Sequence, residues 1–195
     1  MTSDIPVKVQ EVGLEDWYGS LNDMDRVKLK KYIDKADTSS VFSFFLSLIR
    51  AAIADENYRF GLTLCVATST MPFDMYQRFL INEEFIDVLV GREMYNDAKN
   101  VCNINLEIFP EIRGRIEEEN GGKLPERLAF RNRYIDVIVG VEYAYDEAFE
   151  MLKKYNSMGI LTDEDLEYRT NSIRTHRLQR SFDGVYTYRK KGSES

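Results

Sequence analysis

The sequence contains few of the residues from which metal centres and disulfide scaffolds are built. Its 195 residues include 2 cysteines and 1 histidine, too few for a zinc site with four cysteine or histidine ligands. Cys65 and Cys102 both lie in apolar stretches, which predicts free, buried thiols in a reducing compartment. We therefore expect no metal, no cofactor and a cytoplasmic location.

Residues that form turns are also scarce. The chain has 4 prolines and 11 glycines, too few for the turns of a β-sandwich or propeller of this length. Hydrophobic residues make up 44% of the sequence, which is enough for a packed core and excludes a wholly disordered chain. The apolar stretch at residues 41–54 contains Arg50 and is shorter than the roughly 20 residues of a membrane span. The composition predicts an all-α protein that does not enter a membrane.

Motifs that carry chemistry are missing as well. The sequence has no glycine-rich phosphate loop and no GxSxG segment. Glu83, Glu84 and Asp87 cluster on one predicted helix, but no Glu-x-x-His motif accompanies them as in a di-metal bundle. His176 has no nucleophile beside it in the sequence. We predict no catalytic residue and a non-enzymatic protein.

The two ends of the chain differ from its centre. Ile5, Val7 and Val9 alternate with polar residues, which favours a short strand or an extended arm over residues 1–20. Residues 21–183 are expected to form a single helical domain. Residues 184–195 are expected to form a basic, partly disordered tail.

Hydrophobic periodicity, polar caps and prolines divide the central region into helices. Asp74 and Thr162 are typical residues at helix starts, Pro110 is expected to break or kink a helix, and Pro125 is expected to begin one. The predicted helices cover residues 23–35, 41–54, 58–70, 75–91, 95–109, 111–120, 125–140, 142–157 and 163–182. The predicted core consists of Phe45, Leu48, Ile49, Leu62, Cys65, Phe85, Leu89, Ala98, Cys102, Ile135, Ile138, Ala148 and Leu152.

An internal repeat is the most informative feature of the sequence. The segments Tyr58–Cys65 and Tyr95–Cys102 share a tyrosine, a small residue three positions later and a cysteine seven positions later. A weaker third copy begins at Tyr145. The small residues of the three copies are Gly61, Ala98 and Ala148. A small residue lets a neighbouring helix approach closely, so the repeat predicts stacked helix pairs.

The repeat resembles the tetratricopeptide pattern. Tyr95, Ala98 and Pro110 fall at the spacing of that family's aromatic, small and proline positions in and after the second helix, while Asn105 replaces its second small residue. The resemblance covers about residues 41–160. It implies antiparallel helix pairs stacked into a right-handed superhelix with a concave groove. An irregular helical bundle remains the alternative.

Two groups of residues are candidates for binding a partner. Arg127, Arg131 and Tyr134 are spaced so that consecutive members lie about one helical turn apart, and we expect them to face a groove. The alternative is a solvated, ion-paired helix face.

The second group lies near the C-terminus. From Arg169 onward the chain has seven basic and two acidic residues, although its net charge is -7. Arg174, Arg177 and Arg180 form a ridge along one helix, suited to an acidic peptide or a nucleic-acid backbone. The alternative is structural, with these arginines paired to acids such as Glu117–Glu119.

These observations predict a scaffold or adaptor that mediates protein–protein interaction. Its partner is another protein or a second copy of the chain in a homodimer. A nucleic-acid-associated protein that uses the C-terminal arginines is the alternative, which the overall acidity disfavours.

Overall fold

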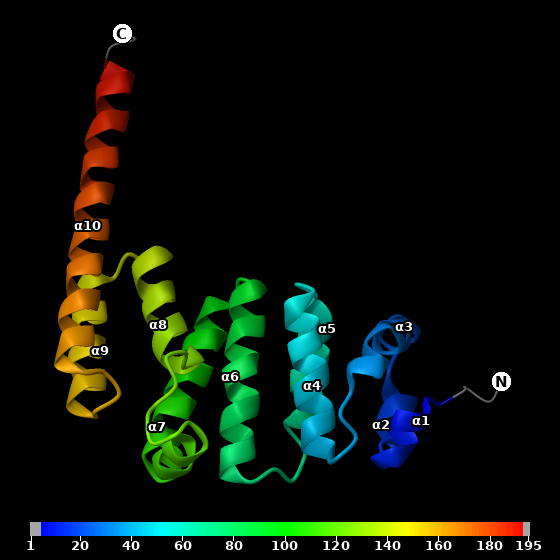
Figure 1. Ribbon diagram of the computed structural model, residues 1–195. Helices are drawn as coiled ribbons and strands as arrows, with labels where there is room; N and C mark the ends of the chain where they lie inside the picture. Colours follow the sequence, from blue (N-terminus) through cyan, green and yellow to red (C-terminus); the bar gives the residue numbers. More distant parts are fainter. Residues whose placement is uncertain (1–4, 193–195) are drawn as a thin grey trace. The chain divides into compact units, whose positions relative to one another are not determined.

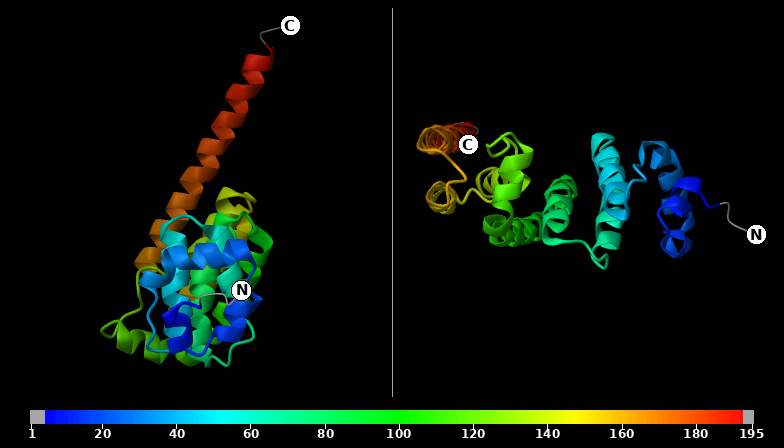
Figure 2. Two further views of the ribbon diagram at one scale, coloured as in Figure 1. Left: turned by 90° about the vertical axis from the view of Figure 1, so that its right-hand side faces the viewer. Right: turned by 60° about the horizontal axis from the view of Figure 1, so that its bottom comes forward.

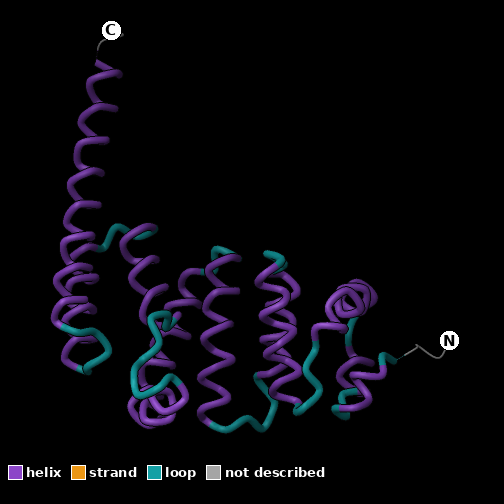
Figure 3. The backbone as a smooth tube through the Cα atoms, viewed as in Figure 1, coloured by secondary structure: helices purple, strands orange, loops and turns teal. Residues whose placement is uncertain are grey.

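The computed structural model describes the backbone of residues 5–192 and the side chains of residues 5–182. Of these residues, 76% lie in ten α-helices, and none lies in a strand (Figure 3). The all-α prediction is confirmed. No helix in the described part is long and apolar enough to cross a membrane.

The chain divides into two compact units, residues 1–134 and 135–195. The prediction of one helical domain over residues 21–183 did not include this division. The boundary lies inside a helix, where no change in composition marks it. The first unit contains α1 (Val7–Glu11), α2 (Glu15–Ser20), α3 (Asp23–Tyr32), η1 (Ile33–Lys35), α4 (Val41–Ala54), α5 (Tyr58–Thr68), α6 (Met75–Gly91), α7 (Tyr95–Glu119) and the start of α8 (Ala129–Gly140) (Figure 1). The second contains the rest of α8, α9 (Tyr145–Ser157) and α10 (Asp163–Gly192).

The extended N-terminal arm is a wrong prediction for residues 7–20, which form the short helices α1 and α2. Val9, Leu14 and Tyr18 are buried in the core of the first unit, while Val7 is exposed. No strand among the described residues is present to pair with an extended segment. A helical turn instead satisfies the backbone groups locally and buries every third or fourth side chain.

Side-chain caps fix where α4 and α6 begin. Ser40 accepts a hydrogen bond from the main-chain N–H of Ser43 at 3.0 Å. Asp74 and Gln77 form a reciprocal capping box at the start of α6. Both helices begin within one residue of the predicted positions.

The predicted repeat has a structural counterpart in the turns that precede α5, α7 and α9. Each turn contains a residue with positive φ two positions before the repeated tyrosine: Glu56 at 53°, Glu93 at 58° and Tyr143 at 58°. The next residue has φ near -85° and ψ near 60° in all three turns. The first two turns are Schellman motifs, in which Asn57 N–H donates to the Ala52 carbonyl and Met94 N–H to the Leu89 carbonyl.

The small residues of the repeat allow close helix contacts. A Cβ atom at Gly61 would lie 2.9 Å from Cγ2 of Val88 on α6 and 3.9 Å from Cβ of Ala52 on α4. Ala98 and Ala148 are buried as well. Consecutive helices from α4 to α7 pack against one another, and the right-hand view of Figure 2 shows α6 beside the pair formed by α4 and α5.

Two predictions based on prolines have different outcomes: Pro110 does not break its helix, which leaves a kink as its expected effect, and the predicted helix start at Pro125 is wrong. Helix α7 continues through Pro110 to Glu119, although it is not straight in Figure 1. Phe109, Ile112 and Ile116 are buried on both sides of the proline, and this continuous apolar face holds the helix together despite the missing N–H. Helix α8 begins at Ala129 and not at Pro125.

The core prediction is largely correct. Eleven of its thirteen residues are buried, while Leu62 and Phe85 are only partly buried. Their neighbours Leu64 and Ile86 take the fully buried positions.

The last helix is longer than predicted. Helix α10 continues to Gly192 and does not end near Phe182, because no proline or strong cap interrupts it. The backbone of positions 184–192 of the predicted tail is therefore helical, and residues 193–195 lie outside the described residues.

Candidate functional site

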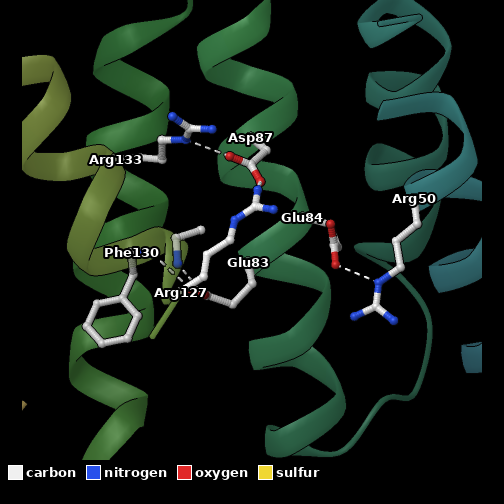
Figure 4. A network of polar contacts seen from close by, with 8 residues as sticks. Arg50, Glu83, Glu84, Asp87, Arg127, Phe130 and Arg133 are labelled. Carbon is white, nitrogen blue, oxygen red and sulfur yellow. Dashed lines mark hydrogen bonds and ion pairs between the residues drawn. The ribbon is translucent and has the colours of Figure 1, made fainter. Parts of the chain in front are cut away.

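A cleft of about 560 Å³ lies in the first unit between α4, α6, the end of α7 and the loop before α8. We call it the α6 cleft. It is lined by Arg50, Ile53, Ala54, Tyr76, Phe79, Leu80, Glu83, Glu84, Asp87, Ile116, Asn120, Pro125, Arg127, Leu128 and Ala129. Three carboxylates of α6 lie along it, and Figure 4 shows the polar contacts that they make.

Glu83 is partly buried and anchors the first turn of α8. Its carboxylate accepts hydrogen bonds from the main-chain N–H groups of Ala129 and Phe130, the latter at 3.1 Å, and from Asn105 Nδ2 at 2.9 Å. These bonds satisfy N–H groups that have no partner within the helix, which explains why α8 begins at Ala129. Burial raises the pKa of Glu83 to about 7, against the opposing effect of the three N–H donors.

Asp87 lies one helical turn beyond Glu83 and holds two arginines. Its side chain is only 6% exposed. It accepts from Arg133 Nε at 2.7 Å and also from Arg127 Nη2. The Arg127 side chain is 67% exposed, so its guanidinium group lies at the edge of the cleft. The ion pair ties the loop before α8 to α6.

Arg50 forms a second fixed cation at the edge of the cleft. It donates from Nε to Glu84 at 2.7 Å, and its side chain is 57% exposed. Within residues 5–182 its two terminal nitrogens have no partner, and the same holds for Nε and Nη1 of Arg127. Both arginines can therefore donate to a bound carboxylate while keeping their own.

Apolar side chains form the floor of the cleft. Phe79, Ile116 and Leu128 are buried there. Phe79 packs on the Phe130 ring, with ring centroids 5.8 Å apart. This packing positions the start of α8.

Tyr76, at the start of α6, also lines the cleft. Its hydroxyl donates to Glu119, and the guanidinium of Arg115 lies 3.9 Å from its ring centroid. Burial, followed by the contact with Glu119, raises the pKa of Tyr76 to about 12. The same hydrogen bond lowers the pKa of Glu119.

The arrangement offers fixed guanidinium donors beside an apolar surface. Comparisons with protein-family models, curated proteins and solved structures found no match. The assignment of a role to the cleft therefore depends on its geometry alone.

The structure separates the first group of predicted site residues. Arg127 lines the α6 cleft, as expected for a groove residue. Arg131 and Tyr134 are buried, which corrects the prediction that they face a partner. Arg131 donates to Asn132 Oδ1 at 3.0 Å and to the Glu126 carbonyl, so it stabilises the loop and the start of α8.

The second group lies exposed on α10, in the second unit. Arg174 donates to Asn171 at 3.3 Å, Arg177 pairs with Asp146 at 3.2 Å, and Arg180 lies over the Tyr143 ring. Arg174 also borders a groove of about 430 Å³ formed by α9 and α10. The structural alternative paired these arginines with Glu117–Glu119. Glu117 pairs instead with Arg113, and Glu119 with Arg115, both within α7.

The two cysteines are free and buried, as predicted. Burial raises the pKa of both thiols. Among the described residues, no group of three or more His, Cys, Asp and Glu side chains is placed to hold a metal ion.

Sequence reasoning missed Arg50, Glu83, Glu84 and Asp87 as members of one cleft. A signal was present at Asn105, where a polar residue replaces a small one in the best repeat. Asn105 is fully buried and bonds to Asn82, Glu83 and the Phe79 carbonyl. A polar residue at a core position requires polar partners on the facing helix, and these partners mark the cleft.

Proposed function

We propose that this chain is a non-enzymatic helical-repeat scaffold or adaptor that binds a partner protein in the α6 cleft. The observation that carries the proposal is the pair of exposed guanidinium groups, Arg50 and Arg127, each fixed by a carboxylate of α6. Fixed donors lose little conformational freedom when a ligand binds. The apolar floor adds contact area for side chains of the partner.

The size and chemistry of the cleft support a peptide segment as the ligand. Its volume of about 560 Å³ falls within the range of protein binding pockets. The spare N–H groups suit carboxylates, and Phe79, Ile116 and Leu128 suit an apolar side chain between them.

A tetratricopeptide-like organisation forms part of the proposal. It is supported by the turn geometry shared at Glu56, Glu93 and Tyr143, and by the close contact between Gly61 and Val88. The free, buried cysteines support a reducing compartment, and we propose a cytoplasmic location.

Affinity capture from the native host, read by mass spectrometry, tests the function. The wild type is compared with Arg50→Ala/Arg127→Ala and with the control Arg59→Ala/Arg92→Ala, which removes two exposed arginines outside the cleft. We expect partners that the control retains and the cleft variant loses, with similar melting temperatures for both variants. Identical partner sets from all three proteins would contradict the role of the cleft.

Nucleic-acid binding is a second candidate, favoured by the exposure of Arg174, Arg177 and Arg180. Their contacts with Asp146 and Tyr143 weaken this candidate. Affinity for a random oligonucleotide at two salt concentrations tests it, since phosphate contacts weaken steeply as salt rises.

A further inference from the structure

One face of α10 carries large apolar side chains that nothing in the described chain covers. Tyr168 is 76% exposed, and Leu178 and Phe182 are 60% exposed. Ile173 of the same helix is buried, and α10 packs against α9. At 3.6 residues per turn the three exposed residues lie about 140° to 220° around the helix from Ile173, so they are opposite the packed face.

These residues belong to a regular stripe, which we call the α10 stripe: Tyr168, Asn171, Thr175, Leu178 and Phe182. Its members are spaced alternately by three and four residues, and all five are exposed. This is the spacing at which two helices pair along a coiled-coil seam. The polar members Asn171 and Thr175 make this seam weaker than a seam built of leucines alone, and they favour one register of pairing.

The charges of α10 indicate which helix fits the stripe. The start of the helix is acidic, with Asp163, Glu164, Asp165 and Glu167. The sequence of its last turns is basic, with Arg189, Lys190 and Lys191, whereas Arg174, Arg177 and Arg180 lie near the middle of the helix. An identical helix in antiparallel orientation therefore places acidic turns beside basic turns at both ends. A parallel pair would bring like charges together.

We propose that two copies of the chain form a homodimer by antiparallel pairing of their α10 stripes. Across the two-fold axis, Leu178 of one copy lies beside Thr175 of the other, and Phe182 beside Asn171, so each large side chain meets a smaller one. The same register sets position 164 beside position 189. Helix α10 extends beyond the end of α9 (Figure 1), which leaves its later turns free of that helix. This inference concerns the second unit and does not depend on the α6 cleft.

Sedimentation velocity over two orders of magnitude in protein concentration tests the proposal. We expect the wild type to convert from monomer to dimer, and Leu178→Glu/Phe182→Glu to raise the dimer dissociation constant at least tenfold. The control Met24→Glu/Val66→Glu adds the same charge at exposed apolar residues of α3 and α5 and should dimerise like the wild type. Higher salt should weaken the dimer because it screens the end-to-end charge pairing.

Cysteine cross-linking then reports the orientation. In the antiparallel register, the two copies of position 175 are offset along the axis by about 5 Å, and those of position 168 by about 25 Å. Thr175→Cys should therefore form a disulfide dimer under mild oxidation, and Tyr168→Cys should not. The native cysteines are buried, so cross-linking is confined to the introduced residue.

Three results would overturn the proposal. The first is a protein that stays monomeric at every concentration, whether or not it binds an oligonucleotide through Arg174, Arg177 and Arg180. The second is a dimer that survives Leu178→Glu/Phe182→Glu. The third is efficient cross-linking through Tyr168→Cys, which requires a parallel pair.

Discussion

Glu83 on α6 holds the first turn of α8, since its carboxylate accepts the Phe130 main-chain N–H at 3.1 Å. This contact couples the cleft to the point where α8 begins. Because desolvation raises the pKa of Glu83, its ionisation affects stability.

The stability of the protein should depend on pH through Glu83. Its pKa is raised from 4.5 to about 7, so the folded state binds more protons than the unfolded state between these values. The free energy of unfolding should therefore fall as pH rises from 4.5 to 7, by at most about 3 kcal/mol from this group. Urea unfolding at a series of pH values measures the slope.

The variant Glu83→Gln should lose this pH dependence. It should also be less stable than the wild type at pH 5 by about 1–3 kcal/mol, because the amide presents N–H groups to main-chain donors. Glu118→Gln, at an exposed position of α7, should keep the wild-type slope. A slope unchanged in Glu83→Gln would assign the pH dependence to other groups.

Gly61→Leu should destabilise the protein by about 1–3 kcal/mol through overpacking, because a Cβ atom would lie 2.9 Å from Val88 Cγ2. Adding Val88→Ala should recover part of the loss. Gly114→Ala is the control, since nothing lies within 4 Å of its Cβ position, and it should stabilise α7 by about 0.5–1 kcal/mol. Thermal melts of the variants distinguish these outcomes.

Glu93→Gly should stabilise the protein by about 0.5–1 kcal/mol, because Glu93 has φ of 58° at the Schellman position where glycine is usual. The same change at Glu107, inside α7, should destabilise by a similar amount. Denaturant unfolding compares the two. A loss of stability in both variants would show that the contacts of the Glu93 side chain contribute more free energy than is gained by removing the strain of its positive φ.

Asp87→Asn should destabilise the first unit more than Arg127→Ala does. The first change weakens two ion pairs of a buried carboxylate, whereas after the second Asp87 keeps Arg133. We expect about 1–3 kcal/mol for Asp87→Asn. Equal effects of the two variants in urea unfolding would show that Arg133 contributes little.

Patterns within a few residues of one another predicted the helix starts and turns that are fixed by contacts between neighbouring residues. Asp74 marked a helix start that the structure confirms, where it forms a capping box with Gln77. The repeated tyrosine and small residue marked turns whose backbone geometry is shared.

The remaining features depend on contacts between residues distant in sequence. Helix α8 begins where Glu83, 46 positions earlier, accepts the Ala129 N–H, and no pattern near Pro125 reveals that. Arg131 is buried because it bonds to the loop before its helix. Residues 7–20 are helical because Val9, Leu14 and Tyr18 fit the core of the first unit.

The Schellman turns before α5 and α7 also bear on how quickly the chain folds. Each pairs two helices that are adjacent in sequence, so many native contacts form without closing a long loop. A topology of this kind favours rapid folding. The bonds from Glu83 to Ala129 and Phe130 span 46 and 47 positions. Forming them closes a longer loop, so it costs more entropy than forming a contact between helices that are adjacent in sequence. The bonds that hold the start of α8 against α6 therefore gain little from local sequence.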